Sequence, residues 1–474
     1  MATKEGKKVM GRKENLQEFI KQQKAKSKNP DKIKIGTIDT FNVGGLESTV
    51  PTLHMTLDDL IGGFQRGIIM ELYGEESAAK STTVGKLIEN LAAFRPDDEE
   101  QLSVLYVDAE GTFGTKFIKR FKNLKKDDMI IYKEHIIEDL WENVEAMIDA
   151  QALDILVIDS IGALQTNQES EKTMDESTVA ALPKKLNTMI KKFYKATEES
   201  KLTVIVMNSE YTNIQTFGSY GPKNVLKGGQ SLKYGKSVSL ELKKSYSKTN
   251  ATIETINGEE VMTEVMIEYT AKKNKLGAPM RSASTMLNVN REVRQTFKYA
   301  LDVINYATKF GIIEKAGAWF KATVNGEEKK FQGQATLTAF VENDVDLYTN
   351  LKLACYAYIY QPFEFYFHFD YLKKKLEKEN QLLKADKKWE LKYMEDIDDE
   401  QKEAGYELLN MPTDIRSKTI DQFLSPLQIE QAEEELAGFY GPERIETFKA
   451  LNFCKELPKK EETTKVKKEK GKGE

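Results

Sequence analysis

The chain has 474 residues, enough for two or three domains, and its 70 basic and 75 acidic side chains leave a net charge of −5. Its two cysteines, Cys355 and Cys454, exclude a disulfide scaffold or a cysteine-based zinc site and are typical of a reducing compartment. No run reaches the ~18 apolar residues of a membrane span, so we expect a soluble intracellular protein.

Charge is unevenly distributed along the chain. Residues 1–36 hold 11 basic and 4 acidic residues, and they predict a short basic helix over 13–28 followed by a strand over 32–36. Residues 390–437 hold 14 acidic and 4 basic residues, which favours a solvated helical surface over an internal acidic mimic of DNA. The Lys/Glu-rich tail, 458–474, is predicted to be disordered.

Apolar strands and helical stretches alternate between residues 50 and 289. We predict strands at 68–72, 103–107, 130–132, 154–158 and 203–207, with an antiparallel addition at 237–243 and 261–271. This order is typical of an α/β fold with a doubly wound, mostly parallel sheet. A small helix-plus-strand module is expected to follow up to residue 345. The period-two phenylalanines between Phe363 and Phe369 then predict a half-buried strand, followed by a charged helix over 371–393.

The segment from Tyr73 to Thr82 has the order of a P-loop: an apolar strand, a small-residue loop ending in Lys80 and Ser81, and a helix. In such a loop, backbone amides and the helix N-terminus hold phosphate, the lysine reaches the outer phosphates and the hydroxyl holds magnesium. Ala79 stands where the pattern has glycine. An alanine fits at this position if its φ stays negative.

Two further acidic positions follow predicted strands. Asp159 ends the strand 154–158, at the edge where ligands of doubly wound sheets bind, and a carboxylate there can organise magnesium. Asp108 and Glu110 follow the strand 103–107, where an acid can orient an attacking water. For each acid the alternative is that it only caps the next turn or helix.

These motifs resemble those of the RecA family of homologous-recombination ATPases, which includes recombinases encoded by bacterial viruses. The resemblance covers about residues 31–345, and it lies in the P-loop entry 71–77, the glutamate segment 107–110, the aspartate strand 159–164 and two downstream runs, 273–279 and 313–320. It implies a RecA-like P-loop NTPase core carrying an N-terminal polymerisation helix and strand and a small α+β C-terminal domain with an extension. The divergent P-loop and the extension favour a bacteriophage source.

The resemblance implies a site for ATP and Mg²⁺. In that site Lys80 holds the β- and γ-phosphates, Glu110 positions water, and Ser81 and Asp159 hold magnesium. Phe117 falls where the family stacks an aromatic ring on adenine, although packing against its own helix explains it equally well. The other residues expected at the nucleotide are Gly74, Glu75, Glu76, Ser77, Ala78, Ala79 and Thr82, with Lys273 and Lys275 reaching the γ-phosphate of a neighbouring subunit.

Two polar stretches, 165–178 and 211–227, are predicted to be loops. Loops this long inside a compact domain are usually functional or disordered, and mixed aromatic, glycine and lysine residues suit single-stranded nucleic acid. The family uses these positions for DNA binding. The implied DNA contacts are Lys184, Lys191, Ile214, Phe217, Lys227, Gly228, Gly229 and Gln230. Ser209 departs from the family, whose glutamine there links nucleotide state to DNA binding.

We therefore expect a DNA-dependent ATPase that forms filaments on single-stranded DNA, pairs it with homologous duplex DNA and exchanges strands in recombination and repair. Its partners would be both DNAs, further copies of itself and a single-stranded-DNA-binding protein or loader, in the cytoplasm (the bacterial host's, if the chain is viral). The alternatives are a catalytically weak, DNA-binding RecA-like paralogue and a hexameric helicase. The expected domains are 1–45 for subunit docking, 46–290 for the ATPase core, 291–345 for the small domain, 346–457 for the extension and 458–474 for the tail.

Overall fold

The structure is a computed structural model that describes residues 48–440 except 98–99, 119, 126, 172–180, 213–223, 228, 248–249, 257, 290–296, 325, 393–398 and 412. The chain divides into two compact units, Met1–Val43 and Gly44–Glu474. In the first unit only Glu18, Phe19, Gln22 and Lys26 are described, and all four are helical. The predicted strand at 32–36 and the tail at 458–474 lie outside the described residues.

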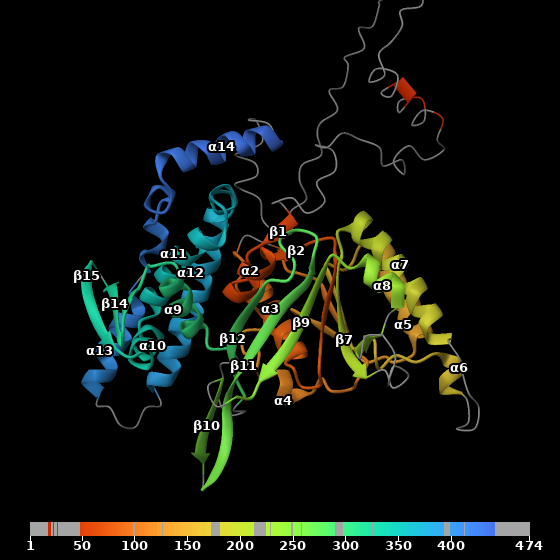
Figure 1. Ribbon diagram of the computed structural model, residues 1–474, viewed down its shortest axis with the longest axis horizontal. Helices are drawn as coiled ribbons and strands as arrows, with labels where there is room; N and C mark the ends of the chain where they lie inside the picture. The colour runs from red at the N-terminus through yellow and green to blue at the C-terminus, as the bar shows by residue number, and fades with distance from the viewer. Residues whose placement is uncertain are drawn as a thin grey trace, which may run out of the picture. The chain divides into compact units, whose positions relative to one another are not determined.

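A ten-stranded sheet forms the centre of the second unit (Figure 1). Eight of its strands run in the order β10-β11-β9-β3-β7-β6-β4-β5, while β12 pairs with β11 and β8 with β7. The stretch from β9 to β5 is parallel, and β8, β10, β11 and β12 add antiparallel pairs. The strands are β3 Ile69–Gly74, β4 Val104–Asp108, β5 Ile130–Tyr132, β6 Ile155–Asp159, β7 Thr203–Thr212, β8 Asn224–Leu226, β9 Val238–Ser245, β10 Ala251–Ile256, β11 Glu259–Asn274 and β12 Ser282–Asn288. The predicted α/β fold with a mostly parallel sheet is confirmed.

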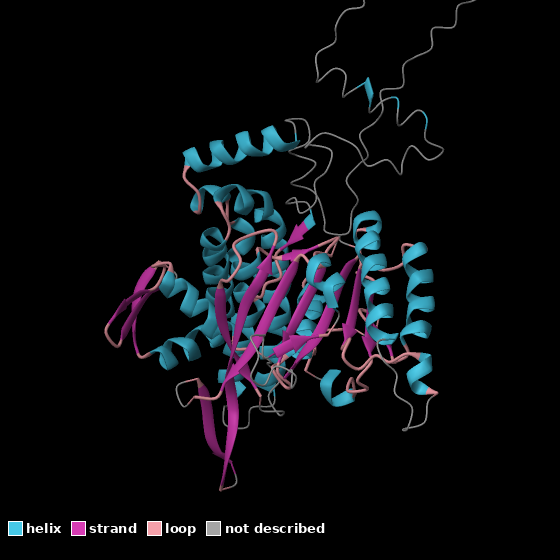
Figure 2. Ribbon diagram, turned by 45° about the vertical axis from the view of Figure 1, so that its right-hand side comes forward, coloured by secondary structure: helices cyan, strands magenta, loops and turns pink. Residues whose placement is uncertain are grey.

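Helices cover both faces of this sheet (Figure 2). Alternate residues of β6 show the division, because Val157 packs into one core and Leu156 into the other. The first core includes α3 Lys80–Ala93, and the second includes α5 Ile137–Asp149, α7 Ala181–Ser200 and α8 Gly229–Gly235. Shorter elements are β1 Thr49–Val50, α2 Met55–Ile61, β2 Phe64–Gln65, α4 Thr115–Ile118 and α6 Asn167–Ser170. Among the described helices, none is both long and apolar enough to cross a membrane.

The helices that follow the ten-stranded sheet share a third hydrophobic core. It includes residues from the small module and from the extension, together with Leu53, Met55 and Phe94 from the region of the ten-stranded sheet. Two buried hydrogen bonds tie the extension to residues 51–58: Tyr356 Oη donates to Asp58 Oδ2 (2.6 Å) and Lys375 Nζ to the Pro51 carbonyl (2.9 Å). The elements are α9 Tyr299–Lys309, β13 Glu314–Ala316, β14 Trp319–Val324, β15 Glu327–Gln332, α10 Gln334–Asn343, α11 Val345–Ile359, α12 Pro362–Lys392, α13 Asp399–Asn410 and α14 Pro426–Tyr440.

The predicted strand over Phe363–Phe369 is wrong, because these residues form the first two turns of α12. Pro362 occupies the first helical position, where its fixed φ favours a helix and its missing N–H is not needed. Five consecutive residues, 365–369, are buried. A helix enclosed on all sides has no amphipathic period, so the alternating phenylalanines gave a false strand signal.

Both predicted loops are shorter than expected. A one-turn helix, α6, interrupts 165–178, and its N-cap Thr166 forms a reciprocal capping box with Glu169. The stretch 211–227 begins inside β7, which extends to Thr212, and ends with β8, which pairs back on β7. Residues 172–180 and 213–223, including the predicted DNA contacts Ile214 and Phe217, lie outside the described residues.

Candidate nucleotide site

The predicted phosphate-binding loop connects the end of β3 to the start of α3. Lys80 folds back over this loop, and its Nζ donates to the carbonyls of Gly74 (3.1 Å) and Glu75 (2.9 Å). Gly74 has φ 155°, and a Cβ there would lie 2.2 Å from the Leu242 carbonyl oxygen of the neighbouring β9. Only glycine therefore lets β3 enter the loop beside β9.

The condition under which an alanine would fit without strain, a negative φ at Ala79, is not met. Ala79 is the N-cap of α3, with φ 66° and ψ 23°, in the left-handed region that favours glycine. Ser77, two residues earlier, has φ 60°. The loop geometry therefore places two L-residues in a conformation that usually costs about 1–2 kcal/mol each. The alanine is strained rather than simply tolerated.

The two magnesium candidates lie together, because the parallel strands β3 and β6 end at the same edge of the sheet. Ser81 Oγ donates to Asp159 Oδ2 at 2.7 Å. Tyr106, from the neighbouring β4, donates to the same carboxylate oxygen at 2.5 Å. Burial raises the pKa of Asp159, and the hydrogen bonds from Tyr106 and Ser81 oppose that rise. The carboxylate and the hydroxyl are oxygen donors of the kind magnesium prefers.

The acids after β4 have different partners. Asp108 accepts from the backbone N–H groups of Thr112 and Phe113, both at 3.0 Å, so it holds the loop between β4 and α4 and does not cap that helix, which begins at Thr115. Glu110 instead accepts from Ser160 Oγ at 2.7 Å. Burial lowers the pKa of Lys80, while the negative charges of Glu110 and Asp159 oppose that shift. The lysine therefore lies in the field of both acids.

The residues expected near adenine and at the subunit boundary have partners within the chain. Phe117 is half-buried and packs between Phe113 and Phe121. The centroid of its ring lies 5.0 Å from the ring centroid of each of these two residues. Lys273 Nζ donates to the carbonyls of Lys233 (2.9 Å) and Tyr234 (3.3 Å) at the end of α8. Both roles stay predictions, as does that of the exposed Lys275.

Among the predicted DNA contacts, Lys184 and Lys191 are exposed on α7, and Lys227 is exposed after β8. Gly229 and Gln230 begin α8, while Gly228 lies outside the described residues. Sequence reasoning missed Tyr106 and Ser160, which hold the two acids in place. Each is one polar residue in or next to an apolar strand, and a pattern of apolar residues gives no signal for it.

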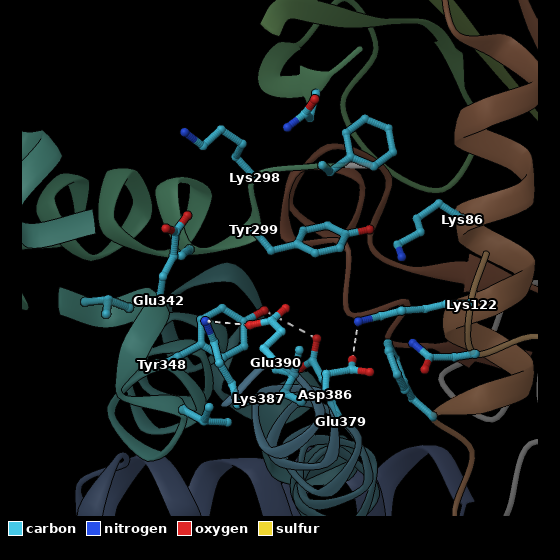
Figure 3. A pocket seen from close by; sticks show the side chains of 18 of the residues that line it. Lys86, Lys122, Lys298, Tyr299, Glu342, Tyr348, Glu379, Asp386, Lys387 and Glu390 are labelled. Carbon is cyan, nitrogen blue, oxygen red and sulfur yellow. Dashed lines mark hydrogen bonds and ion pairs between the residues drawn. The ribbon is translucent and has the colours of Figure 1, made fainter. Parts of the chain in front are cut away.

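A cavity of about 530 Å³ lies elsewhere, between the region of the ten-stranded sheet and the C-terminal helices (Figure 3). Lys86 and Lys122 line it from the core, and Glu379 and Asp386 from α12. Lys86 pairs with Glu89, and Lys122 pairs with Asp386 across the cavity. The lining includes none of Lys80, Ser81, Glu110 or Asp159, so the cavity is separate from the P-loop site.

Residues 14–293 match the RecA N-terminal domain family, so the chain belongs to the RecA family. It is 27% identical to Protein RecA of Nitratidesulfovibrio vulgaris over 305 residues, which are 64% of this chain and 79% of that protein. It is 23% identical to Protein RecA of Malacoplasma penetrans over 292 residues, 62% of this chain and 82% of that one. The crystal structure of a RadB recombinase aligns with 50% of this chain and covers 94% of the RadB chain, at 16% sequence identity. The TM-score of this alignment is 0.36, which is too low to carry an argument. Both RecA relatives are bacterial, and the expected phage origin gains no support.

Proposed function

We propose that this chain is an ATPase that binds single-stranded DNA as a filament and catalyses homologous pairing and strand exchange. One observation carries the proposal: in a RecA-family chain, the P-loop Ser81 and the strand-end Asp159 are in direct hydrogen-bond contact, 2.7 Å apart, beside Lys80. A family member that had lost nucleotide binding would have no reason to keep these three groups together.

The site residues have separate roles toward ATP. The Lys80 ammonium would exchange the loop carbonyls of Gly74 and Glu75 for the β- and γ-phosphates, which are stronger, charged acceptors. The N-terminus of α3 would add its free amides. Ser81 and Asp159 would hold magnesium, which supplies charge neutralisation at the phosphates when bound.

Glu110 would position the attacking water. Its carboxylate accepts a hydrogen bond from Ser160, the residue that follows Asp159. The acid that positions water is therefore held by the neighbour of the aspartate that would hold magnesium. The Asp159 side chain is held in turn by Tyr106. This arrangement fixes both carboxylates before substrate binds, and such preorganisation is the main source of catalytic power in phosphoryl transfer.

The DNA and filament roles rest on family membership and on surface charge. Lys184, Lys191 and Lys227 would contact phosphates, and the second polar stretch would contact bases. Residues 1–45 would dock on an adjacent copy, 46–290 would act as the motor, and 291–345 would form the small domain. Described residues of the extension, up to Leu436, pack on that domain through a shared core, so we assign the extension a structural contribution.

Strand exchange between homologous DNAs tests the proposal, together with electron microscopy of the filaments. The proposal predicts joint molecules and filaments that both require ATP, and Lys80→Ala should abolish the joint molecules. Filaments without strand exchange in the wild type would favour the weak paralogue, and closed rings that unwind duplex DNA would favour the helicase.

A further inference from the structure

The side chain of Asn208 joins the phosphate-binding strand to the end of the second predicted DNA-binding stretch. Its Nδ2 donates to Glu71 Oε1 (3.1 Å) and to the Lys227 carbonyl (2.7 Å), and its Oδ1 accepts from the Ser209 N–H (3.0 Å). Asn208 and Glu71 are both 0% exposed. Both amide protons are in use, so neither partner can shift without leaving a buried polar group unpaired.

Glu71 lies in β3, three residues before the P-loop glycine Gly74, and its second oxygen is also occupied. Glu71 Oε2 accepts from Ser239 Oγ (2.8 Å) on β9 and forms an ion pair with Lys236, the residue after α8. All of these groups are buried. A buried network in which every polar group has its hydrogen-bond partner is rigid, because moving one member would break the bonds of the others. The P-loop strand is therefore rigidly connected to β7, β9 and the end of α8.

The side chain of Lys227 makes a second connection, to the segment after Asp159 that holds Glu110. Its Nζ donates to the Gly162 carbonyl at 2.7 Å. Gly162 follows Ser160 by two residues, and Ser160 Oγ holds Glu110. The Lys227 side chain is exposed, so a DNA phosphate can reach its ammonium. A phosphate is a charged acceptor and competes well with a neutral carbonyl.

We propose that Asn208 and Lys227 couple the ATP site to DNA in this chain. Asn208 is a positioning residue that transmits movement of β3 to the end of the second DNA-binding stretch. Lys227 restrains the segment after Asp159 until DNA draws its ammonium away from Gly162. This inference rests on the proposed function. It moves the coupling role from position 209, which the family fills with glutamine, to the neighbouring asparagine.

The first test compares Asn208→Ala with Ser209→Ala, neighbouring positions in one strand. The measurement is the factor by which a non-hydrolysable ATP analogue tightens single-stranded DNA binding, with the reciprocal effect of DNA on analogue binding as an internal check. The wild type should show a factor of about 10 or more, within the usual range for coupled sites. Asn208→Ala should bring it below about 2, while Ser209→Ala keeps it within about twofold of wild type. Loss in Ser209→Ala with retention in Asn208→Ala overturns the inference.

The second test uses an exposed position and does not depend on a buried variant folding. Lys227→Met should raise ATP turnover without DNA by about fivefold or more, the lower end of the usual coupling range, because the restraint on Gly162 is gone. Lys195→Met removes the same charge from an exposed position of α7 that has no role in the proposed site, and it should leave this turnover unchanged. Equal DNA-free turnover in Lys227→Met and wild type overturns the role of Lys227. A wild type that binds neither ATP nor DNA overturns the proposed function instead, and one that binds both without coupling overturns only this inference.

Discussion

Replacing Ala79 by glycine should stabilise the ATPase core. Ala79 has φ 66° at the start of α3, where glycine adopts the same conformation without the clash of a Cβ. The left-handed region costs a non-glycine residue about 1–2 kcal/mol. Glycine gives back about 0.4–1 kcal/mol through the greater freedom of its unfolded chain. The expected net gain is about 0.8 kcal/mol in the free energy of unfolding, the difference between the midpoints of these two ranges.

Ala93→Gly is the matched control, at the other end of the same helix. Ala93 is half-buried like Ala79 but is the last residue of α3, where glycine costs up to about 0.5–1 kcal/mol relative to alanine. The two substitutions remove the same methyl group, so their effects should have opposite signs. This comparison isolates the backbone conformation from the loss of apolar contact.

Urea unfolding followed by tryptophan fluorescence measures both variants. Trp141 on α5 packs against Phe193 in the ATPase core and reports on its unfolding. The midpoint should rise for Ala79→Gly and fall for Ala93→Gly. If both variants lose stability by similar amounts, Ala79 does not have a strained, positive φ and the interpretation of the loop is wrong.

Three further substitutions test the site and the core. Glu110→Gln should lower DNA-stimulated turnover by about 100-fold or more with ATP affinity retained, because water positioning contributes at least that much; unchanged turnover would contradict the assignment. Tyr106→Phe removes a hydrogen bond that lowers the pKa of Asp159, so the acid limb of the pH–turnover profile should move to higher pH; no shift, or a downward one, would count against it. Burial lowers the pKa of His368 from 6.5 to about 3, so its contribution to stability is complete above pH 6.5 and is lost as pH falls toward 3. His368→Phe should therefore reduce the slope of stability against pH between pH 4 and 6 by about 1.4 kcal/mol per unit, and an unchanged slope in urea titrations would refute the assignment.

The sheet and the proximity of Ser81 to Asp159 could be predicted because each has a local signature. The apolar runs locate the strands, and the rule that parallel strands present their carboxyl ends at one edge brings Asp159 to Ser81. The strand order supplied by the structure explains why Tyr106 reaches the same carboxylate, since β4 pairs with β6. That contact is between strands, and no spacing along the chain encodes it.

Other features were hidden for definite physical reasons. The sign of φ at Ala79 is decided by the turn that leads from β3 to α3, and the residue itself prefers the opposite sign. The phenylalanines of α12 are enclosed on all sides, so their spacing carried no helical period. Asn208 is one polar residue at the end of the buried run of β7, and only the positions of Glu71 and Lys227 show what it connects.

The central claim is that this RecA-family chain hydrolyses ATP in response to single-stranded DNA. Steady-state ATP turnover of the purified full chain, with and without a long single-stranded DNA and with Lys80→Ala in parallel, tests it most directly. We predict turnover that rises about tenfold or more on adding DNA and is lost in the variant. Turnover that ignores DNA, or that persists unchanged in Lys80→Ala, would contradict it.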